Sequence, residues 1–417
     1  VLLIGIPVML SELTIGRGAQ ANAIDSYGKL GHPGYKWVGW FGVIVAFIIT
    51  SYYCHVGGWV LRYVASYATE ATKVYADPLG YFYALLGYNA VTGETWFPLT
   101  AVIFAGIFMG ITCFIIVKGV ESGIERFNKI GMPALFVILI ILLIRALTMP
   151  GAGEGLQYML IPDWSKVTFS TVLSALGQAF FSLSLGMAIM VTYGSYVKKE
   201  ENLAKNAAII CGMDTLVALI AGFIIVPAVF ATLGAEGVGK GAGFAFSSLA
   251  GVFQQMPGGQ FFGILFYMLL LFAALTSCIS LVEGVVAFAT ERFGWKRTPT
   301  TIILCVVMFL LGTIYTCSQA AFDIKGIWFD FKNGLTTPIF GDFMEFLTDR
   351  LMIPVCALGS CLFVGWAWKP QNAIREIELD GKPFRLKKAY SFLVKYLAPI
   401  SIIIIIVASF ATGTTLS

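Results

Sequence analysis

Long hydrophobic stretches separated by short polar segments dominate this chain. They fall near residues 1–16, 38–67, 97–117, 131–149, 171–196, 206–233, 259–290, 300–317, 351–367 and 389–411. Most approach or exceed the roughly 20 residues with which a helix crosses the hydrocarbon core of a bilayer. The stretches lack the alternation of a β-barrel strand, and only helices or closed barrels can span lipid. The pattern predicts an all-α integral membrane protein with about ten transmembrane helices.

The polar segments between these stretches alternate in charge. The segments 17–37, 118–130, 197–205, 291–299 and 368–388 together hold 18 of the 27 Lys and Arg residues. Because positively charged loops stay on the cytoplasmic side, these segments are predicted to be cytoplasmic in a multi-pass protein of the plasma (inner) membrane. The basic balance therefore reports topology, and we expect the bilayer, not a nucleic acid, as the partner of this surface.

The same orientation makes the first stretch run from outside to inside. The chain begins with Val1, already within an apolar stretch. We therefore expect at least one further helix to precede residue 1, and we expect residues 1–417 alone not to transport. The alternative is a cleaved signal peptide, which would be followed by a polar mature N-terminus that this chain does not have.

Composition agrees with lipid as the solvent and disfavours an enzyme. Hydrophobic residues make up 58% of the chain and charged residues 12%, against about 45–50% and 25% in soluble domains. All eight cysteines lie in apolar stretches without a CxxC pair, which is typical of small packing residues. Two scattered histidines, His32 and His55, offer no metal or haem site and no nucleophile–base pair.

Three acidic residues, Glu12, Asp214 and Glu283, fall inside the hydrophobic stretches. Ionisable groups at membrane depth are costly and mark functional positions. Asp214 is nine residues beyond Lys205, or roughly 13 Å along a helix, close to the middle of the bilayer. An unpaired carboxylate there calls for a cation, either an ion or a proton. The alternative is a protonated acid hydrogen-bonded between helices.

Two stretches carry polar residues at their centres. Residues 181–188 read FSLSLGMA, and residues 273–278 read AALTSC. Serine and glycine weaken a helix locally, and transporters use such breaks to bind Na⁺ and substrate. Hydroxyl oxygens also suit an alkali ion. Close helix packing, or Ser and Thr bonding back to their own helix, would explain the same residues.

Several motifs together resemble the neurotransmitter:sodium symporters, particularly the bacterial amino-acid members, over essentially the whole chain. These motifs are Gly5-Ile6-Pro7 to Glu12, Gly16-Arg17, Tyr52-Tyr53 ahead of Trp59, Gly119 to Glu125-Arg126-Phe127, Met132-Pro133, Pro162-Asp163-Trp164, Gly177 to Gly186, Thr192 to Tyr196, and Ala273 to Ser277. The resemblance implies one transmembrane domain over 1–417, built from two inverted five-helix repeats. Its helices would be the family's second to eleventh, with a discontinuous helix over 171–196 and an extracellular loop over 233–258.

The resemblance also implies the binding residues. The substrate pocket would be lined by Ile49, Tyr53, Phe181, Ser184, Met187, Ser277 and Leu281. Ser182 and Asp214 would bind a first Na⁺, and a second Na⁺ would lie among Ala273, Thr276 and Ser277. Glu345 would be the acid of the outer gate, with Asp342 close by, and Glu291 the acid of the inner gate.

Asp214 stands where chloride-dependent animal members carry asparagine, and Ala218 stands where they carry a serine. A fixed carboxylate can replace the anion that balances Na⁺, so we expect chloride-independent, Na⁺-coupled symport of a hydrophobic L-amino acid. A proton-exchange role for Asp214 on the return step stays open. The alternative is a Na⁺-coupled carrier of an amine, GABA or an osmolyte, and a channel is disfavoured because rings of charge are missing.

Overall fold

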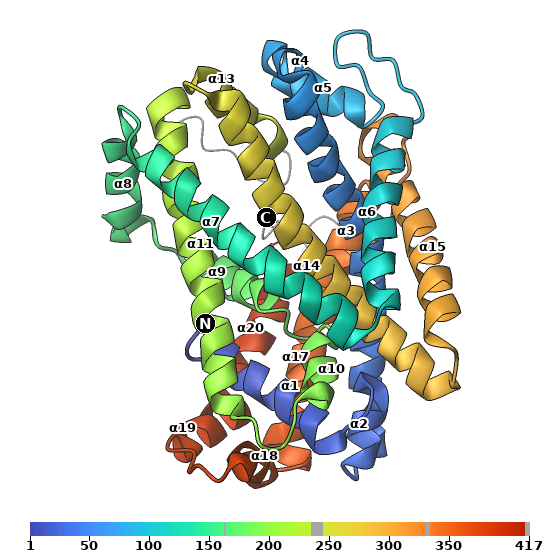
Figure 1. Ribbon diagram of the computed structural model, residues 1–417. Helices are drawn as coiled ribbons and strands as arrows, with labels where there is room; N and C mark the ends of the chain where they lie inside the picture. Colours follow the sequence, from blue (N-terminus) through green and yellow to red (C-terminus); the bar gives the residue numbers. More distant parts are fainter. Residues whose placement is uncertain (162, 235–244, 331–333, 413–417) are drawn as a thin grey trace.

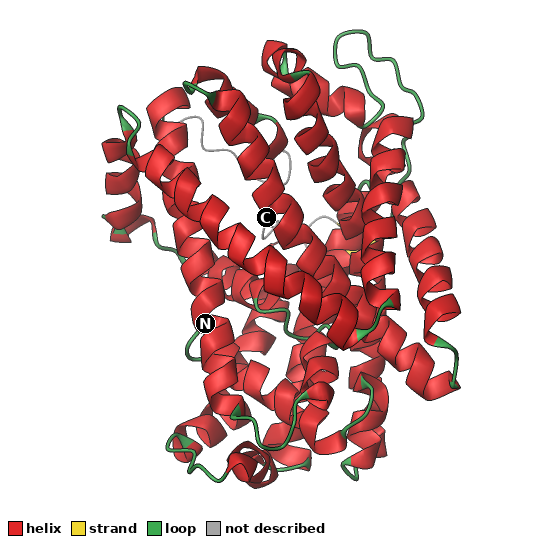
Figure 2. Ribbon diagram, viewed as in Figure 1, coloured by secondary structure: helices red, strands yellow, loops and turns green. Residues whose placement is uncertain are grey.

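The computed structural model describes residues 1–161, 163–234, 245–330 and 334–412, and helices form almost all of it (Figures 1 and 2). The long helices are α1 (Gly5–Ala19), α3 (Lys36–Thr69), α6 (Leu99–Val117), α7 (Arg126–Leu147), α9 (Phe169–Ser182), α11 (Leu203–Leu233), α14 (Gly259–Phe293), α15 (Arg297–Thr316) and α20 (Ala398–Thr412). The short helices are α2 (Ala23–Lys29), α4 (Ala71–Ala76), α5 (Pro78–Leu85), α8 (Ala152–Leu160), α10 (Ile189–Tyr196), α13 (Ser248–Gln255), α16 (Phe340–Glu345), α17 (Ile353–Leu362), α18 (Pro370–Ile377) and α19 (Lys387–Phe392).

A small hairpin interrupts the helical fold between α15 and α16. Strands β1 (Trp328–Asp330) and β2 (Gly334–Thr336) pair antiparallel, with Phe329 opposite Leu335. This short hairpin lies in a connecting segment, and the fold is all-α as expected. The expected extracellular loop 233–258 includes residues 235–244, which lie outside the described residues, and α13, whose Leu249 and Phe253 are buried.

Eight helical runs of the described chain are long and apolar enough to cross a membrane. They are Pro33–Thr69, Leu99–Val117, Ser122–Leu147, Leu203–Leu233, Gly259–Phe293, Arg297–Ala321, Phe340–Ala367 and Lys387–Ala408. The other two predicted stretches correspond to α1, which has 15 residues, and to the pair α9 and α10, which have 14 and 8. Each of these three helices is shorter than the roughly 20 residues of a full span.

Helices α3 and α14 pack against each other through the centre of the molecule, and α14 crosses it obliquely (Figure 1). Gly263 of α14 explains one close approach, because a Cβ there would lie 2.2 Å from the ring of Tyr67. Small residues allow helix backbones to meet at short distance in membranes. These two helices form the scaffold on which Tyr53 and Thr276 are carried.

Several spans contain a turn of π-helix. Such turns occupy Val120–Glu125, Cys317–Ala321, Phe346–Met352, Phe363–Ala367 and Leu393–Leu397. A π-turn inserts one extra residue and rotates the face that the following helix presents.

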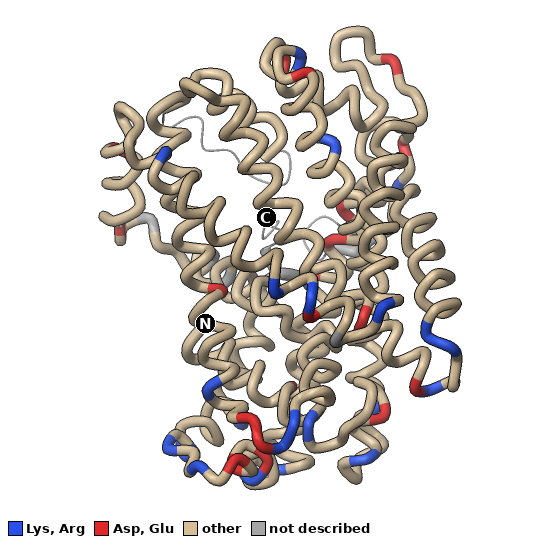
Figure 3. The backbone as a smooth tube through the Cα atoms, viewed as in Figure 1, with Lys and Arg blue, Asp and Glu red and all other residues tan. Residues whose placement is uncertain are grey.

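Lysine and arginine gather at one end of the bundle, where α2, α18 and α19 lie (Figure 3). We call this the basic end. It contains the segments 17–37, 197–205 and 368–388, whose basic residues include Lys36, Lys198 and Lys387. The opposite end carries α4, α5 and α13 (Figure 1). The charge distribution is the one expected of a membrane protein with a cytoplasmic face.

Candidate functional site

The expected discontinuous helix consists of two helices in the structure. α9 ends at Ser182, and α10 begins at Ile189. Between them Ser184, Gly186 and Ala188 adopt left-handed backbone angles, with φ of 54°, 72° and 62°. Glycine tolerates this region, whereas serine and alanine are strained there. Three such residues within five positions prevent a continuous helix over residues 171–196.

Glu12 of α1 provides a hydrogen-bond acceptor for one backbone N–H of the broken segment. Its Oε1 accepts the backbone N–H of Gly186 at 3.0 Å and the hydroxyl of Ser360 at 3.2 Å. The side chain is only 1% exposed. Gly186 packs tightly, since a Cβ there would lie 2.5 Å from the carbonyl oxygen of Ile353. Sequence reasoning singled out Glu12 as an intramembrane acid but did not assign it this partner.

The structure brings together the two residues expected at the first sodium site. The hydroxyl of Ser182, at the last turn of α9, lies 2.7 Å and 2.8 Å from the two carboxylate oxygens of Asp214 on α11. Asp214 is half-buried. A carboxylate and a hydroxyl this close present several oxygen atoms to one point, which is the ligand type that a hard cation prefers.

The residues expected at the second sodium site lie on adjacent turns of α14. The hydroxyl of Thr276 donates to the carbonyl oxygen of Ala273 at 2.8 Å. This is the bond back to the same helix that was open as an alternative. It also places two of the expected ligand oxygens side by side. Ser277 follows, and the phenol of Tyr53 on α3 lies near its side chain.

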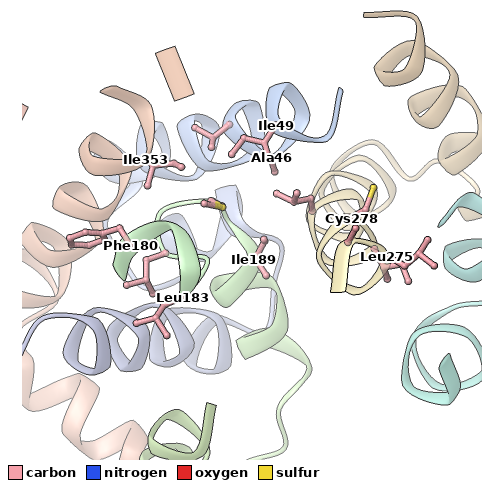
Figure 4. Close-up of a cluster of buried hydrophobic side chains, with 14 of the residues drawn as sticks. Ala46, Ile49, Phe180, Leu183, Ile189, Leu275, Cys278 and Ile353 are labelled. Carbon is pink, nitrogen blue, oxygen red and sulfur yellow. The ribbon is translucent and has the colours of Figure 1, made fainter. Parts of the chain in front are cut away.

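The expected substrate residues come from three elements around the break. Ile49 of α3, Met187 of the break and Leu281 of α14 are buried, whereas Phe181 is 39% exposed. In Figure 4, Ile49, Ile189 and Cys278 come from α3, α10 and α14 and gather around the same region. Ser184 lies in the left-handed part of the break. Tyr53 and Ser277 supply the polar groups of this otherwise apolar surface.

A separate apolar cavity of about 430 Å³ lies beside α9. It is lined by residues 1–5 and by Leu176, Ala179, Phe180 and Leu185. None of the expected substrate residues lines it. The cavity is therefore separate from the hydrogen-bonded groups around the break.

The expected gate acids lie at opposite ends of the site. Glu345, at the end of α16, accepts a hydrogen bond from the phenol of Tyr315 at 2.7 Å. Tyr315 stacks on Tyr52, whose hydroxyl is 3.2 Å from that of Thr348. At the basic end, Glu291 accepts the backbone N–H of Asn22 at 2.6 Å.

A buried ion pair, which sequence reasoning missed, lies between the break and the basic end. Glu283 of α14 is fully buried and pairs with Arg297, the first residue of α15. The phenol of Tyr196 on α10 donates to the same carboxylate at 2.8 Å. Removing one partner of such a pair leaves a buried charge and is strongly destabilising. Arg297 had been assigned to a loop, so no spacing rule linked it to Glu283.

Charged side chains also cluster around Asp25 of α2, at the basic end. Asp25 accepts hydrogen bonds from Lys36 at 3.2 Å and from Arg292 at 2.7 Å. Together with a hydrogen bond from Asn22, they hold the pKa of the Asp25 carboxyl below its usual range, although partial burial acts in the opposite direction. Among the described residues, no three His, Cys, Asp or Glu side chains are grouped to hold a metal ion. The oxygen atoms described above are hydroxyls, carbonyls and single carboxylates, which suit a monovalent cation.

Comparisons with known proteins agree with this architecture. The model of the sodium:neurotransmitter symporter family matches residues 87–416. An uncharacterised sodium-dependent transporter of Haemophilus influenzae is 34% identical over 98% of this chain and 88% of its own length. The uncharacterised sodium-dependent transporter YhdH of Bacillus subtilis is 34% identical over 97% and 86%.

Among solved structures, the crystal structure of MhsT in complex with L-phenylalanine superimposes with a TM-score of 0.85. It is 37% identical, and the match covers 98% of this chain and 89% of that one. The fold expected from the hydrophobic pattern and from the motifs is therefore confirmed at the level of the whole bundle. This chain belongs to the sodium:neurotransmitter symporter family.

Proposed function

We propose that this sodium-coupled transporter is a symporter for a hydrophobic L-amino acid. The observation that carries the proposal is its likeness to MhsT, which was crystallised with L-phenylalanine. The apolar residues Ile49, Met187 and Leu281 around the break support a hydrophobic side chain. Tyr53 and Ser277 carry hydroxyl groups beside this surface, and Tyr53 would donate to the substrate carboxylate.

Two sodium ions would bind beside the substrate. Ser182 and Asp214 would hold the first ion, because their oxygens already converge. Ala273, Thr276 and Ser277 would hold the second, with the Ala273 carbonyl and the Thr276 hydroxyl 2.8 Å apart. Phe181, Ser184, Glu345 and Glu291 would line and close the path, Phe181 and Glu345 on the outer side and Glu291 on the inner side.

Transport would be independent of chloride. The carboxylate of Asp214, beside Ser182, would supply a fixed negative charge at the first ion site, so that no bound anion would be needed to balance Na⁺. The basic end would face the cytoplasm, with the protein in the plasma membrane. The side that carries α4, α5 and α13 would then be extracellular.

Uptake into proteoliposomes tests the proposal. The full-length protein is reconstituted, and labelled L-phenylalanine, L-leucine, GABA and betaine are offered with an inward Na⁺ or K⁺ gradient. We expect uptake of the hydrophobic amino acids under the Na⁺ gradient alone, equal in chloride and gluconate. Uptake that does not depend on Na⁺, or that is confined to GABA or betaine, would contradict it.

A further inference from the structure

Helices α10 and α14 are joined by two side-chain contacts between the break and the basic end. Tyr193 of α10 meets Ser280 of α14, and Tyr196 of α10 meets Glu283 of α14. The spacing is three residues on both helices, so each pair uses the same face of its helix. The two contacts therefore act as successive rungs between one half of the broken helix and the scaffold.

The two rungs differ in chemistry. Glu283 is buried, charged and paired with Arg297 as well as with Tyr196. Tyr193 and Ser280 are neutral, and their hydroxyl oxygens are 2.8 Å apart. A neutral hydrogen bond changes an equilibrium only by about two- to tenfold, much less than a buried charged pair. The neutral rung is thus the one whose breaking requires little free energy.

The neutral rung leads directly to the proposed second sodium site. Tyr193 donates to Ser280, and Ser280 donates to the carbonyl oxygen of Thr276 at 3.0 Å. Thr276 in turn donates its own hydroxyl to the carbonyl of Ala273. Each hydroxyl in this series of hydrogen bonds donates its single proton to the next oxygen in the direction of the proposed ion site. The chain therefore fixes α10 to the same turn of α14 that would supply the ion ligands.

Packing places α10 close enough for this contact to matter. A Cβ on Gly284 of α14 would lie 3.8 Å from the hydroxyl of Thr192 on α10, so the helices are in contact on this side as well. Thr192 is 2% exposed, and its hydroxyl has no hydrogen-bond partner among the described residues. The interface is held by the two tyrosine rungs and not by Thr192.

We propose that Tyr193 and Ser280 form a latch that couples the docking of α10 on α14 to retention of the second sodium ion. This inference rests on the proposed function and deepens it. While α10 is docked, the chain from Tyr193 to Thr276 holds the ion-binding turn and closes the way to the basic end. When α10 moves off α14, this rung opens and the ion is released toward the cytoplasm. Tyr193 and Ser280 act as positioning residues and touch neither ion nor substrate.

Sodium dependence of uptake tests the latch. In Tyr193→Phe and in Ser280→Ala, the Na⁺ concentration for half-maximal uptake is expected to rise about three- to tenfold, because one hydrogen bond of the closed state is lost. The half-saturating amino-acid concentration at saturating Na⁺ should stay within twofold of wild type. The double variant should equal Ser280→Ala, since that substitution alone already removes the bond to Tyr193.

The matched control is Tyr390→Phe, which removes a phenol that lies 2.9 Å from the hydroxyl of Ser11 elsewhere in the bundle. Its Na⁺ dependence should not change. Hydrogen exchange gives a second measurement: Na⁺, but not K⁺, should slow exchange of residues 189–196 in wild type and in Tyr390→Phe, and this protection should disappear in Tyr193→Phe.

Three results would overturn the latch while wild-type uptake stays Na⁺-dependent. They are a half-saturating Na⁺ concentration within twofold of wild type in both single variants, a double variant whose effect is the product of the two, and an equal shift in the amino-acid value. Wild-type uptake without Na⁺ dependence would instead overturn the proposed function, and the latch with it.

Discussion

Ser182 directs one hydroxyl at both carboxylate oxygens of Asp214, at 2.7 Å and 2.8 Å. The two residues are 32 positions apart and come from the end of α9 and the middle of α11. A hydroxyl shared between both oxygens fixes the carboxylate plane and leaves its remaining lone pairs free for a cation. The break in the membrane helix is therefore tied to the charged group of the proposed first ion site.

Replacing Asp214 by Asn tests the role of this charge. The variant removes the fixed anion without changing the size of the side chain, so Na⁺ at the first site loses its counter-charge. We expect uptake that now requires chloride, or loss of uptake by at least tenfold. Uptake in chloride and in gluconate is the measurement.

Asp323→Asn is the control, because Asp323 is an exposed acid paired with Lys325 in a loop. It should leave uptake in both salts unchanged. Chloride-free uptake at the wild-type rate in Asp214→Asn would sink the proposal of a substitute anion.

Gly186→Ala should damage the break. At φ 72° a side chain is strained, and its Cβ would lie 2.5 Å from the carbonyl oxygen of Ile353. We expect the melting temperature in detergent to fall and uptake to be lost. Gly212→Ala on α11 is the matched control, because a Cβ there meets nothing within 4 Å. Alanine is the better helix former by about 1 kcal/mol, so the control should be neutral or slightly stabilising. Equal behaviour of the two variants would contradict this account.

Glu12→Ala should destabilise the protein more than Glu12→Gln. Alanine leaves the buried N–H of Gly186 without its acceptor, at a cost of about 1–3 kcal/mol, whereas glutamine keeps an oxygen in reach. Thermal unfolding of both variants in the same detergent measures the difference. If the two variants melt at the same temperature, the hydrogen bond to Gly186 does not stabilise the break.

Glu70 gives a prediction for acidic pH at the end that carries α4 and α5. Hydrogen bonds from Lys73 and Tyr81, with the charge of Arg62, lower the pKa of Glu70 from 4.5 to about 2. A lowered pKa in the folded state stabilises the protein above the unfolded value, and this contribution is lost as pH falls from about 4.5 toward 2. The loss should amount to about 1–3 kcal/mol, because the group is partly exposed.

Melting temperatures at pH 7 and pH 3 measure this loss. Glu70→Gln should show a smaller drop between the two pH values than wild type. Glu154→Gln, at an exposed position of α8, should drop as wild type does. An unchanged drop in Glu70→Gln would show that other groups cause the acid sensitivity.

The lengths of the hydrophobic stretches predicted the helical bundle well. In lipid, an apolar stretch of about 20 residues satisfies its backbone hydrogen bonds by forming a helix. All ten stretches correspond to helical segments, including the one that is broken at Ser182. Serine and glycine at its centre were the visible signal. Ser182 and Asp214 were expected in one site through the family resemblance, and the two side chains are hydrogen-bonded.

Other contacts had no signal in the sequence. Glu12 and Gly186 are 174 positions apart, and no periodicity says which helices pack together. Arg297 pairs with Glu283 because α15 begins at Arg297, a position expected to lie in a loop. The left-handed angles of Ser184 and Ala188 also went unforeseen, since these residue types usually avoid that region.

The length of α14 has a consequence for the surrounding lipid. Its 35 residues extend over about 52 Å, well beyond a hydrocarbon core of about 30 Å. The helix runs obliquely through the bundle (Figure 1), and its last turns carry the exposed residues Glu291 and Arg292. A membrane helix adapts to a thinner or thicker bilayer by changing its tilt angle. Because the same helix carries Thr276 and Ser280, bilayer thickness would act mechanically on the turn proposed to bind the second ion.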